Sequence, residues 1–398
     1  MPARFLQIHT LTSYAASLLN RDDAGFAKRM PFGGAIRTRV SSQCLKRHWR
    51  VYEGENGLGS IDAPESVRSR VSFERYIVEP LVREGTNDTV ARAAAQKIIG
   101  KVFGGEAKKE KAEKKGGKKS QAEEESAQDA VVRTAQVTVL GRPELDYLCQ
   151  IAREAIRDAG GDVKKVETAI DTRMKNEREL KKNIQALKPG SLEAGLGAAL
   201  FGRMVTGDVL ARTDGAIHVA HAMTVHGQMT ESDYFSAIDD LIREEGEQES
   251  GHINATELTS GVFYGYIVVD VDGLVANLGG DRTLAGDVVH KLVHMVATVS
   301  PGAKKGSTAP YAYSHLVLAE CGKAQPRTLQ NAFIEPVPTS GNLIANAYRA
   351  MAQHLADLDG MYGKTEQRAH AGLRTNGLFE QPMNLGGLAD WGKGRVLE

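Results

Sequence analysis

Hydrophobic and polar positions divide the chain into two mixed α/β stretches with a helical stretch between them. Residues 4–13 alternate in hydrophobicity: the apolar Leu6 and Ile8 are each followed by a polar residue, Gln7 and His9. This pattern is typical of a strand. A loop is predicted from about residue 17 to residue 40. It carries NRDD (20–23) and FGG (32–34), whose two glycines allow the backbone to turn sharply.

The next predicted element is a helix over residues 43–53, capped by Ser41 and Ser42. At 100° per residue this helix has two distinct faces. The polar face carries Gln43, Lys46, Arg47 and Arg50, and the apolar face carries Leu45, Trp49 and Tyr52. We expect the apolar face to pack on the sheet. The basic row suits the phosphates of a nucleic acid, and a solvated amphipathic helix is the alternative interpretation.

Residues 65–190 have helical periodicity, with helices predicted over 88–103, 143–158 and 162–187. The interruption at 105–128 is rich in Lys and Glu and has no large apolar residue, so we expect a disordered loop there. The second half predicts strands over 261–274 and 311–320 and helices over 283–299 and 341–356. This order favours an α+β, ferredoxin-like core divided by a helical insertion.

Composition changes this picture in one respect. The 398 residues carry 50 basic and 50 acidic side chains, so the net charge is zero and the average does not indicate a nucleic-acid binder. The first 50 residues nevertheless hold nine Lys and Arg against two Asp. The three scattered cysteines and the absence of an apolar leader or a long apolar run predict a cytoplasmic protein without a membrane span.

Other candidate sites have ordinary interpretations beside the functional ones. Arg203 and Met204 follow glycine-rich sequence. In the functional interpretation Arg203 holds a phosphate and Met204 wedges between bases; in the ordinary one both side chains pack within the fold. The neighbouring lysines Lys304 and Lys305 follow Pro301-Gly302 in a basic loop. Histidines 218, 221, 226, 290 and 294 lack convincing ligand spacing, and HKLVH (290–294) lacks the glutamate of HExxH, so we expect no metal or cofactor.

Several of these segments together resemble the CasC family, the backbone subunit of the type I-E CRISPR Cascade complex. The matching segments are LNRDD (19–23), FGG (32–34), RVSSQ (39–43) with LKR (45–47), GRM (202–204), DGAIHVAHAMTVH (214–226), DYFSAIDDL (233–241), SGVFY (260–264) and PGAKK (301–305). They cover roughly 1–52 and 195–306.

The resemblance implies a hand-shaped protein with a palm of modified RNA-recognition-motif fold. The implied divisions are palm at 1–54, 191–219 and 261–398, helical fingers at 55–190 and a hairpin-like thumb at 220–260. It further implies a non-catalytic protein that forms a hexameric helical filament on guide RNA, kinks the RNA at intervals and presents bases to target DNA. Its partners would be crRNA, target DNA, copies of itself, other Cascade subunits and, indirectly, a helicase-nuclease.

The resemblance also implies site residues. The guide contacts are Asn20, Arg21, Ser41, Ser42, Gln43, Lys46, Arg47, Arg50, Arg203, Met204 and Thr206. The thumb contacts are Tyr234, at a position where the family has tryptophan, and Phe235. Lys28, Lys304 and Lys305 are expected to face incoming DNA.

Two alternatives remain at the level of sequence. One is a metal-dependent endoribonuclease of the type III kind, for which Asp233, Asp239 and Asp240 are the candidate residues. The other is a homo-oligomeric scaffold that carries no RNA.

Overall fold

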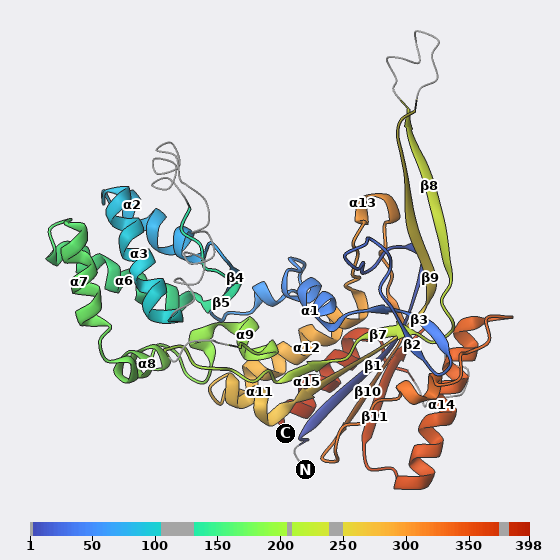
Figure 1. Ribbon diagram of the computed structural model, residues 1–398. Coiled ribbons are helices and arrows are strands. Elements are labelled where there is room, and N and C mark those ends of the chain that lie inside the picture. Colours follow the sequence, from blue (N-terminus) through green and yellow to red (C-terminus); the bar gives the residue numbers. More distant parts are fainter. Residues whose placement is uncertain (1–2, 105–130, 205–208, 239–249, 374–381) are drawn as a thin grey trace. The chain divides into compact units, whose positions relative to one another are not determined.

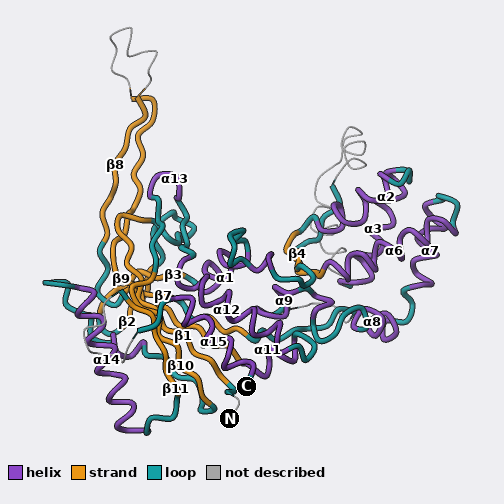
Figure 2. The backbone as a smooth tube through the Cα atoms, turned by 180° about the vertical axis from the view of Figure 1, so that it is seen from behind, coloured by secondary structure: helices purple, strands orange, loops and turns teal. Residues whose placement is uncertain are grey.

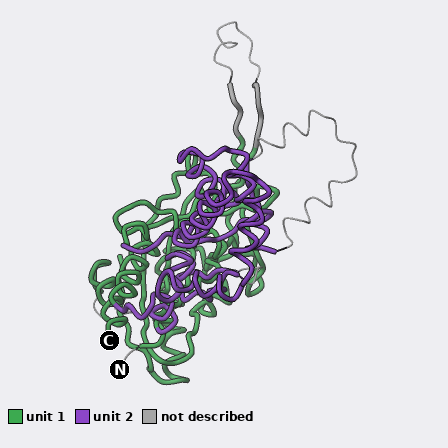
Figure 3. The backbone as a smooth tube through the Cα atoms, turned by 90° about the vertical axis from the view of Figure 1, so that its left-hand side faces the viewer, with its two compact units in different colours: residues 1–61, 217–271, 283–398 green, residues 62–216, 272–282 purple. Residues whose placement is uncertain are grey.

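The computed structural model describes residues 3–104, 131–204, 209–238, 250–373 and 382–398 (Figure 1). The chain divides into two compact units (Figure 3). Unit 1 comprises residues 1–61, 217–271 and 283–398, and unit 2 comprises residues 62–216 and 272–282. The expected disordered loop at 105–128 lies outside the described residues.

Unit 1 is built on an antiparallel sheet whose centre is β1 (Phe5–Ser17), flanked by β9 (Ser250–Asp270) and β10 (Ser314–Gly322). The strand order is β11-β10-β1-β9-β7-β3-β2, and β6 and β8 also pair with β9 (Figure 2). The helix α1 (Ser42–Arg50) lies in the chain between β1 and β7 (Ala222–Thr224), and α12 (Arg282–Thr298) lies between β9 and β10. This arrangement confirms the predicted α+β class with a split β-α-β core.

Helices cover both faces of the sheet. Leu11, Tyr264 and Leu316 pack against α14 (Leu343–Tyr362) on one face. On the opposite face, α15 (Leu385–Leu397) lies so close that a Cβ on Gly392 would be 3.7 Å from Leu6 and 3.4 Å from Val289 of α12. β1 is thus buried on both faces: Leu6 and Ile8 lie on one face, and Leu11 lies on the other together with the buried polar residues Gln7 and His9.

One buried carboxylate organises the polar part of this core. Glu320 of β10 is fully buried and accepts hydrogen bonds from Arg327 at 2.7 Å and from Arg368 at 2.6 Å. His9 of β1 lies 3.1 Å from the same carboxylate and 2.8 Å from the Tyr264 hydroxyl. Burial opposes ionisation of Glu320, but the hydrogen bonds from His9 and Arg327 prevail and hold its pKa well below the usual range.

Two hairpins extend from the sheet. β2 (Arg29–Phe32) and β3 (Ala35–Val40) are joined by Gly33 and Gly34, both with positive φ, so part of the predicted loop at 17–40 is a tight hairpin. β8 (Thr230–Ile238) pairs with the first half of β9 from Thr230↔Thr259 to Ile238↔Ser250. Prediction missed β2 and β3 because each is short and its neighbours are polar.

Unit 2 is mainly helical. Its core joins α3 (Asp88–Phe103), α6 (Arg142–Asp158), α7 (Val163–Arg173) and α8 (Glu177–Gln185). The single helix predicted over 162–187 is wrong, because Asn176 caps a new helix by accepting the Glu179 N–H. A small sheet pairs β4 (Ser66–Ser69) with β5 (Thr138–Gly141).

Residues 191–216 belong to unit 2, whereas the sequence assigned 191–219 to the palm. The reason is local: the Leu196 N–H donates to the Pro64 carbonyl at 2.7 Å, and Ser66 donates to the Ala194 carbonyl. This segment includes α9 (Leu196–Phe201).

Elements of the second half follow the predicted order with shifted ends. The strands and helices are β6 (Ile217–Val219), α11 (Val271–Asn277), α13 (Lys305–Thr308) and β11 (Gln367–Gly372), in addition to those above. β11 and α15 were not predicted. Within the described part of the chain, no helix is both long and apolar enough to cross a membrane.

The Glu320 network yields a first prediction. Glu320→Gln removes the buried carboxylate that Arg327 and Arg368 share, while Arg327 keeps Glu366 and Arg368 keeps Asp359 as a partner. The free energy of unfolding at pH 7 therefore falls by about 1.5–3 kcal/mol, as for the loss of hydrogen bonds to a charged group. In the native protein, stability from this group is present above the pKa of the unfolded carboxyl and declines as pH falls below it. The difference between variant and native protein therefore narrows by about 1.4 kcal/mol per pH unit below about pH 4.3.

Urea unfolding at several pH values measures this difference. Glu53→Gln, at an exposed position, is the control and leaves the unfolding energy unchanged. A Glu320→Gln variant as stable as the native protein at pH 7 contradicts the assignment.

Candidate nucleic-acid interface

The start of α1 is fixed by two polar contacts. The Ser41 hydroxyl accepts the Cys44 N–H at 3.3 Å, as an N-cap residue does. The Asn20 side chain accepts the Ser41 N–H at 2.9 Å. The predicted helix and its cap at Ser41 are therefore confirmed, but α1 ends at Arg50 instead of residue 53, so Tyr52 lies beyond it. Asn20 and Ser41 hold the helix in place. Ser41 and Ser42 are themselves buried.

The two faces of α1 lie as the sequence indicated. Trp49 is 2% exposed, and Leu45 packs with Val40 and Phe263 against the sheet. On the other face, Gln43 and Arg47 are exposed, and Lys46 and Arg50 are half-buried. The apolar face thus determines the direction in which the basic side chains leave the helix.

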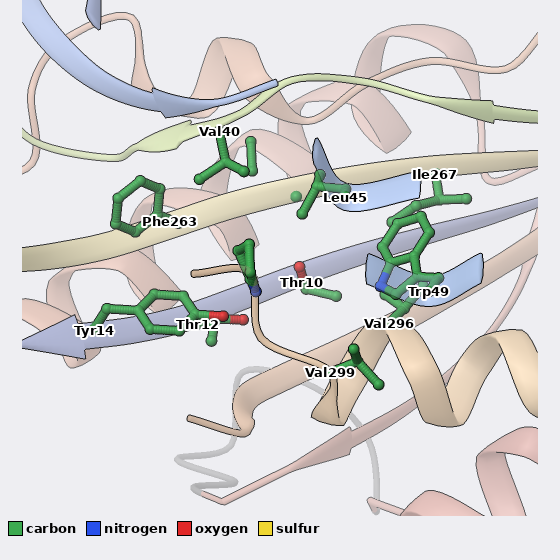
Figure 4. Close-up of a pocket in the computed structure, with 13 residues that line it drawn as sticks. Thr10, Thr12, Tyr14, Val40, Leu45, Trp49, Phe263, Ile267, Val296 and Val299 are labelled. Atoms are coloured by element: carbon green, nitrogen blue, oxygen red, sulfur yellow. The ribbon is translucent and has the colours of Figure 1, made fainter. Parts of the chain in front are cut away.

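A cavity lies between α1 and the sheet (Figure 4). Thr10, Phe263 and Ile267 of the sheet line it together with Leu45 and Trp49 of α1. Its volume of about 40 Å³ is room for a few water molecules at most. The cavity is a packing gap under the helix and is too small to be a ligand site.

Four cations gather around α1, and we call Lys28, Arg39, Arg47 and Lys305 the basic cluster. Burial lowers the pKa of His48 on α1, and the charges of Lys305 and Arg47 lower it further. Burial likewise lowers the pKa of His221, with added effects of Arg39 and Lys28.

Burial raises the pKa of the Cys44 thiol, and the charges of Arg47 and Lys28 oppose that rise. These four cations therefore act, in overlapping pairs, on the same three side chains, Cys44, His48 and His221. They form one positively charged region of unit 1.

Backbone hydrogen bonds link this region. The Lys28 N–H donates to the Asn20 carbonyl at 2.9 Å, and the Arg39 N–H donates to the Lys28 carbonyl at 2.7 Å. Arg39 also lies 3.0 Å from Nδ1 of His221. Arg21 is exposed, and its backbone forms an isolated β-bridge with that of Ala27 in the same loop.

The loop 301–305 contacts both the segment that follows β1 and the β8–β9 hairpin. The Ala303 N–H donates to the Leu18 carbonyl at 2.9 Å, and Nζ of Lys304 donates to the Thr256 hydroxyl of β9 at 2.7 Å. Lys28 and Lys305 act on side chains of α1, and Lys304 contacts β9. Their expected contact with DNA stays a prediction.

The β8–β9 hairpin occupies the region expected to be the thumb. Tyr234 is 65% exposed on β8. Phe235 lies on the same strand and is paired with Asn254 of β9. The structure describes its backbone and not its side chain. Asp239 and Asp240 also lie outside the described residues.

Arg203 requires a correction. We expected an exposed guide contact, but its side chain is 1% exposed and pairs with the fully buried Glu144 of α6 at 2.6 Å. The same guanidinium donates to the Ala211 carbonyl at 2.8 Å, and the Arg203 backbone bridges Thr213. Arg203 thus neutralises Glu144 inside unit 2, where an unpaired carboxylate would be costly.

Met204 directly follows Arg203 and is 94% exposed. Arg203 and Met204 belong to unit 2, whereas α1 belongs to unit 1. Thr206 lies outside the described residues. In the GRM motif, a fully buried arginine is thus followed directly by an exposed methionine.

The histidines have separate surroundings. His226 is buried, and its Nε2 accepts the Val262 N–H at 3.1 Å. His290 and His294 lie on α12 with ring centroids 5.0 Å apart, and His290 pairs with Asp390 at 3.4 Å. Among the residues that the structure describes, no three His, Cys, Asp or Glu side chains gather as a metal site.

Sequence reasoning missed several members of the interface. Arg39 and His221 stood in segments used for the resemblance but were not assigned a role. Their signal would have been strand pairing, because β3 and β7 are neighbours through Arg39↔Met223. Thr256 carried no signal, since only the hairpin register brings it to Lys304.

The geometry can be compared with known proteins. Residues 6–386 match the model of the family described as CT1975-like protein (Cas_CT1975). No curated protein matches the sequence.

Two solved structures are similar in fold. One is described as "CRISPR RNA-guided surveillance complex, pre-nicking", with 25% identity, a TM-score of 0.77 and coverage of 98% of this chain and 100% of that chain. The other is described as "CRISPR RNA-guided surveillance complex", with 23% identity, a TM-score of 0.65 and coverage of 98% and 99%.

The fold and the family model define a CRISPR-associated protein of the Cascade backbone type, which confirms the resemblance found in the sequence. The chain belongs to the CT1975-like protein family.

The packing of α1 yields a second prediction. Trp49→Ala removes a buried indole from between helix and sheet, so the free energy of unfolding falls by about 3–5 kcal/mol. Calorimetric unfolding measures the loss. The matched control is Trp391→Ala on α15, which is half-buried and costs less. Equal melting of the Trp49 variant and the native protein would show that α1 is not held by this side chain.

The buried pair of Arg203 and Glu144 yields a third prediction. Arg203→Ala leaves Glu144 buried and unpaired and lowers the free energy of unfolding by about 3–5 kcal/mol. Met204→Ala, one residue away, changes it by no more than about 0.5 kcal/mol because the side chain is exposed. Urea unfolding of both variants measures the contrast, and similar effects of the two substitutions would disprove it.

Proposed function

We propose that this protein is the backbone subunit of a type I-E CRISPR surveillance complex, in which it binds guide RNA through phosphate and ribose and does no catalysis itself. Copies assemble as a helical filament along crRNA, together with other Cascade subunits. The complex works in the cytoplasm, and a separate helicase-nuclease cuts the target DNA. The proposed assembly is a hexamer.

The observation that carries this proposal is the basic cluster beside the polar face of α1. Lys28 and Lys305 act on side chains of α1, and Arg39 lies on the neighbouring strand beside His221. Gln43 and Arg47 are exposed on α1 itself, whose position is fixed by Trp49. A guide differs in sequence from one spacer to the next, so its carrier must bind backbone and not base edges. Cations and an amide on a rigid helix meet that requirement.

The proposed palm contacts are those of unit 1. They are Asn20, Arg21, Ser41, Ser42, Gln43, Lys46, Arg47 and Arg50, of which Asn20 and Ser41 act by holding α1. Lys28, Lys304 and Lys305 face incoming DNA in this proposal. Arg203 is withdrawn as a phosphate contact, because it is the buried partner of Glu144.

Met204 and the β8–β9 hairpin supply the proposed kink. An apolar side chain that is 94% exposed beside a fixed backbone suits insertion between bases. The hairpin, with Tyr234 exposed, would fold over the RNA held by a neighbouring copy and flip one base at each interval. The remaining bases then stay available for pairing with target DNA.

A metal-dependent ribonuclease receives no support from the described residues. Asp233 is exposed on β8, and Asp239 and Asp240 lie outside the described residues.

The test is a salt titration of guide RNA binding. Lys46 and Arg50 lie one helical turn apart, and each phosphate contact on a single strand contributes roughly 0.7 to the slope of log affinity against log salt. Lys46→Ala with Arg50→Ala is expected to weaken binding and to flatten the slope by about 1.4 per subunit. The loss is the same for two unrelated spacers, because backbone contacts carry no base information.

The matched control removes a Lys and an Arg with the same spacing from another helix. Arg178 and Lys182 are exposed on α8, and replacing both with alanine leaves the slope unchanged. An unaltered slope in the Lys46/Arg50 variant, or a loss confined to one spacer, contradicts the proposed function.

A further inference from the structure

Two exposed tyrosines follow the loop 301–305 and belong to none of the contacts described above. Tyr311 is 73% exposed and Tyr313 is 72% exposed. Both precede β10, in the short segment that runs from α13 into the sheet. Two large aromatic side chains two residues apart, each mostly in solvent, form a patch that the fold itself does not use.

The backbone between them is tightly held. Oγ of Ser300 accepts the Ala312 N–H at 3.0 Å and donates to the Ala312 carbonyl at 2.9 Å. The Tyr14 hydroxyl of β1 donates to the same Ser300 oxygen at 3.3 Å. Ala312 is therefore fixed from the sheet side, and the residues on either side of it are the ones that face solvent.

The burial pattern repeats this alternation. Pro310 is buried, Ala312 and Ser314 are half-buried, and Tyr311 and Tyr313 are exposed. This alternation of exposed and half-buried positions indicates that the two rings leave on the same, solvent-facing side of the segment. A pinned backbone with two parallel aromatic positions is a preformed platform, because little backbone freedom is lost when a ligand binds it.

The platform adjoins positive charge. A Cβ on Gly302 would lie 2.7 Å from Cγ of Pro310 and 3.0 Å from Cγ of Lys305, so Lys305 and the residue before Tyr311 meet at one point. The charge of Lys305 also acts on His48 of α1, which connects the segment with the basic cluster. Aromatic rings beside cations recognise single-stranded nucleic acid, since bases stack on the rings while the cations neutralise phosphate.

We propose that Tyr311 and Tyr313 form a stacking site for unpaired bases of a single nucleic-acid strand that also contacts the basic cluster. The proposal rests on the proposed function only in taking nucleic acid as the ligand. Stacking needs no base-edge contact, so the site accepts any sequence. The bases come either from guide RNA or from a single strand of target DNA, which share this chemistry.

The experiment uses the full-length protein and fluorescence anisotropy with labelled single strands of one length. The strands are an RNA, a DNA of the same sequence and an abasic DNA that keeps the phosphates. Tyr311→Ala and Tyr313→Ala are each expected to weaken binding to the base-bearing strand about fivefold or more. Tyr311→Phe and Tyr313→Phe retain the affinity of the native protein, because the ring is kept.

Three controls isolate stacking. Binding to the abasic strand is unchanged in the alanine variants, and so is the salt slope, because no ionic contact is lost. Tyr362→Ala, which removes a tyrosine that is 67% exposed at the end of α14, leaves all affinities unchanged. A greater loss on RNA than on DNA identifies the guide as the source of the bases, and the reverse identifies the target.

Two results overturn the stacking site while leaving the proposed function intact. One is native affinity of the alanine variants for base-bearing strands. The other is an equal loss on abasic and base-bearing strands. Where the native affinity of the first result comes with a loss of self-association, the tyrosines belong to a contact between copies of the chain.

Discussion

The burial of Trp49 between α1 and the sheet is the interaction on which the interface depends. A nine-residue helix is too short to be stable alone, so its position comes from its apolar face and its cap. Once Trp49 is buried and the Asn20 side chain holds Ser41, the rotation of the helix about its axis is fixed. Gln43 and Arg47 then have only one direction in which to point, which is away from the sheet.

Local concentration of charge reconciles a neutral chain with a nucleic-acid interface. Several of the acidic residues are engaged away from α1: Glu320 pairs at the centre of unit 1, Glu144 pairs with Arg203 in unit 2, and others pair along the helices of unit 2. The cations around α1 come from four separate segments of the chain. Net charge therefore describes solubility here, and the arrangement of charge describes binding.

The sequence predicted the parts of the fold that rest on local periodicity. Helices with a clear apolar stripe, such as α3 and α6, were found within one residue of their ends, and the cap at Ser41 was read correctly. The break between α7 and α8 was missed, because Leu180 and Ile184 continue the helical spacing across it. Arg203 was misread because a surface arginine and a buried one look alike until their partner, 59 residues away in the chain, is known.

The interface shows the same limit. Residues on α1 were predictable because one helix face displays them together, and the lysines of the loop 301–305 were predictable from their motif. Arg39, His221 and Thr256 join them only through strand pairing, and the outward direction of Tyr311 and Tyr313 depends on Ser300, eleven residues or more before them. Long-range pairing of this kind is not encoded in any short window of sequence.

The central claim is that the assembled protein carries RNA. The most direct measurement is the ratio of absorbance at 260 nm to that at 280 nm for the purified assembly, before and after treatment with ribonuclease under unfolding conditions. The account predicts excess absorbance at 260 nm from an RNA that copurifies with the protein and is digested once the protein is unfolded. An assembly of the same size whose spectrum is that of protein alone would contradict it.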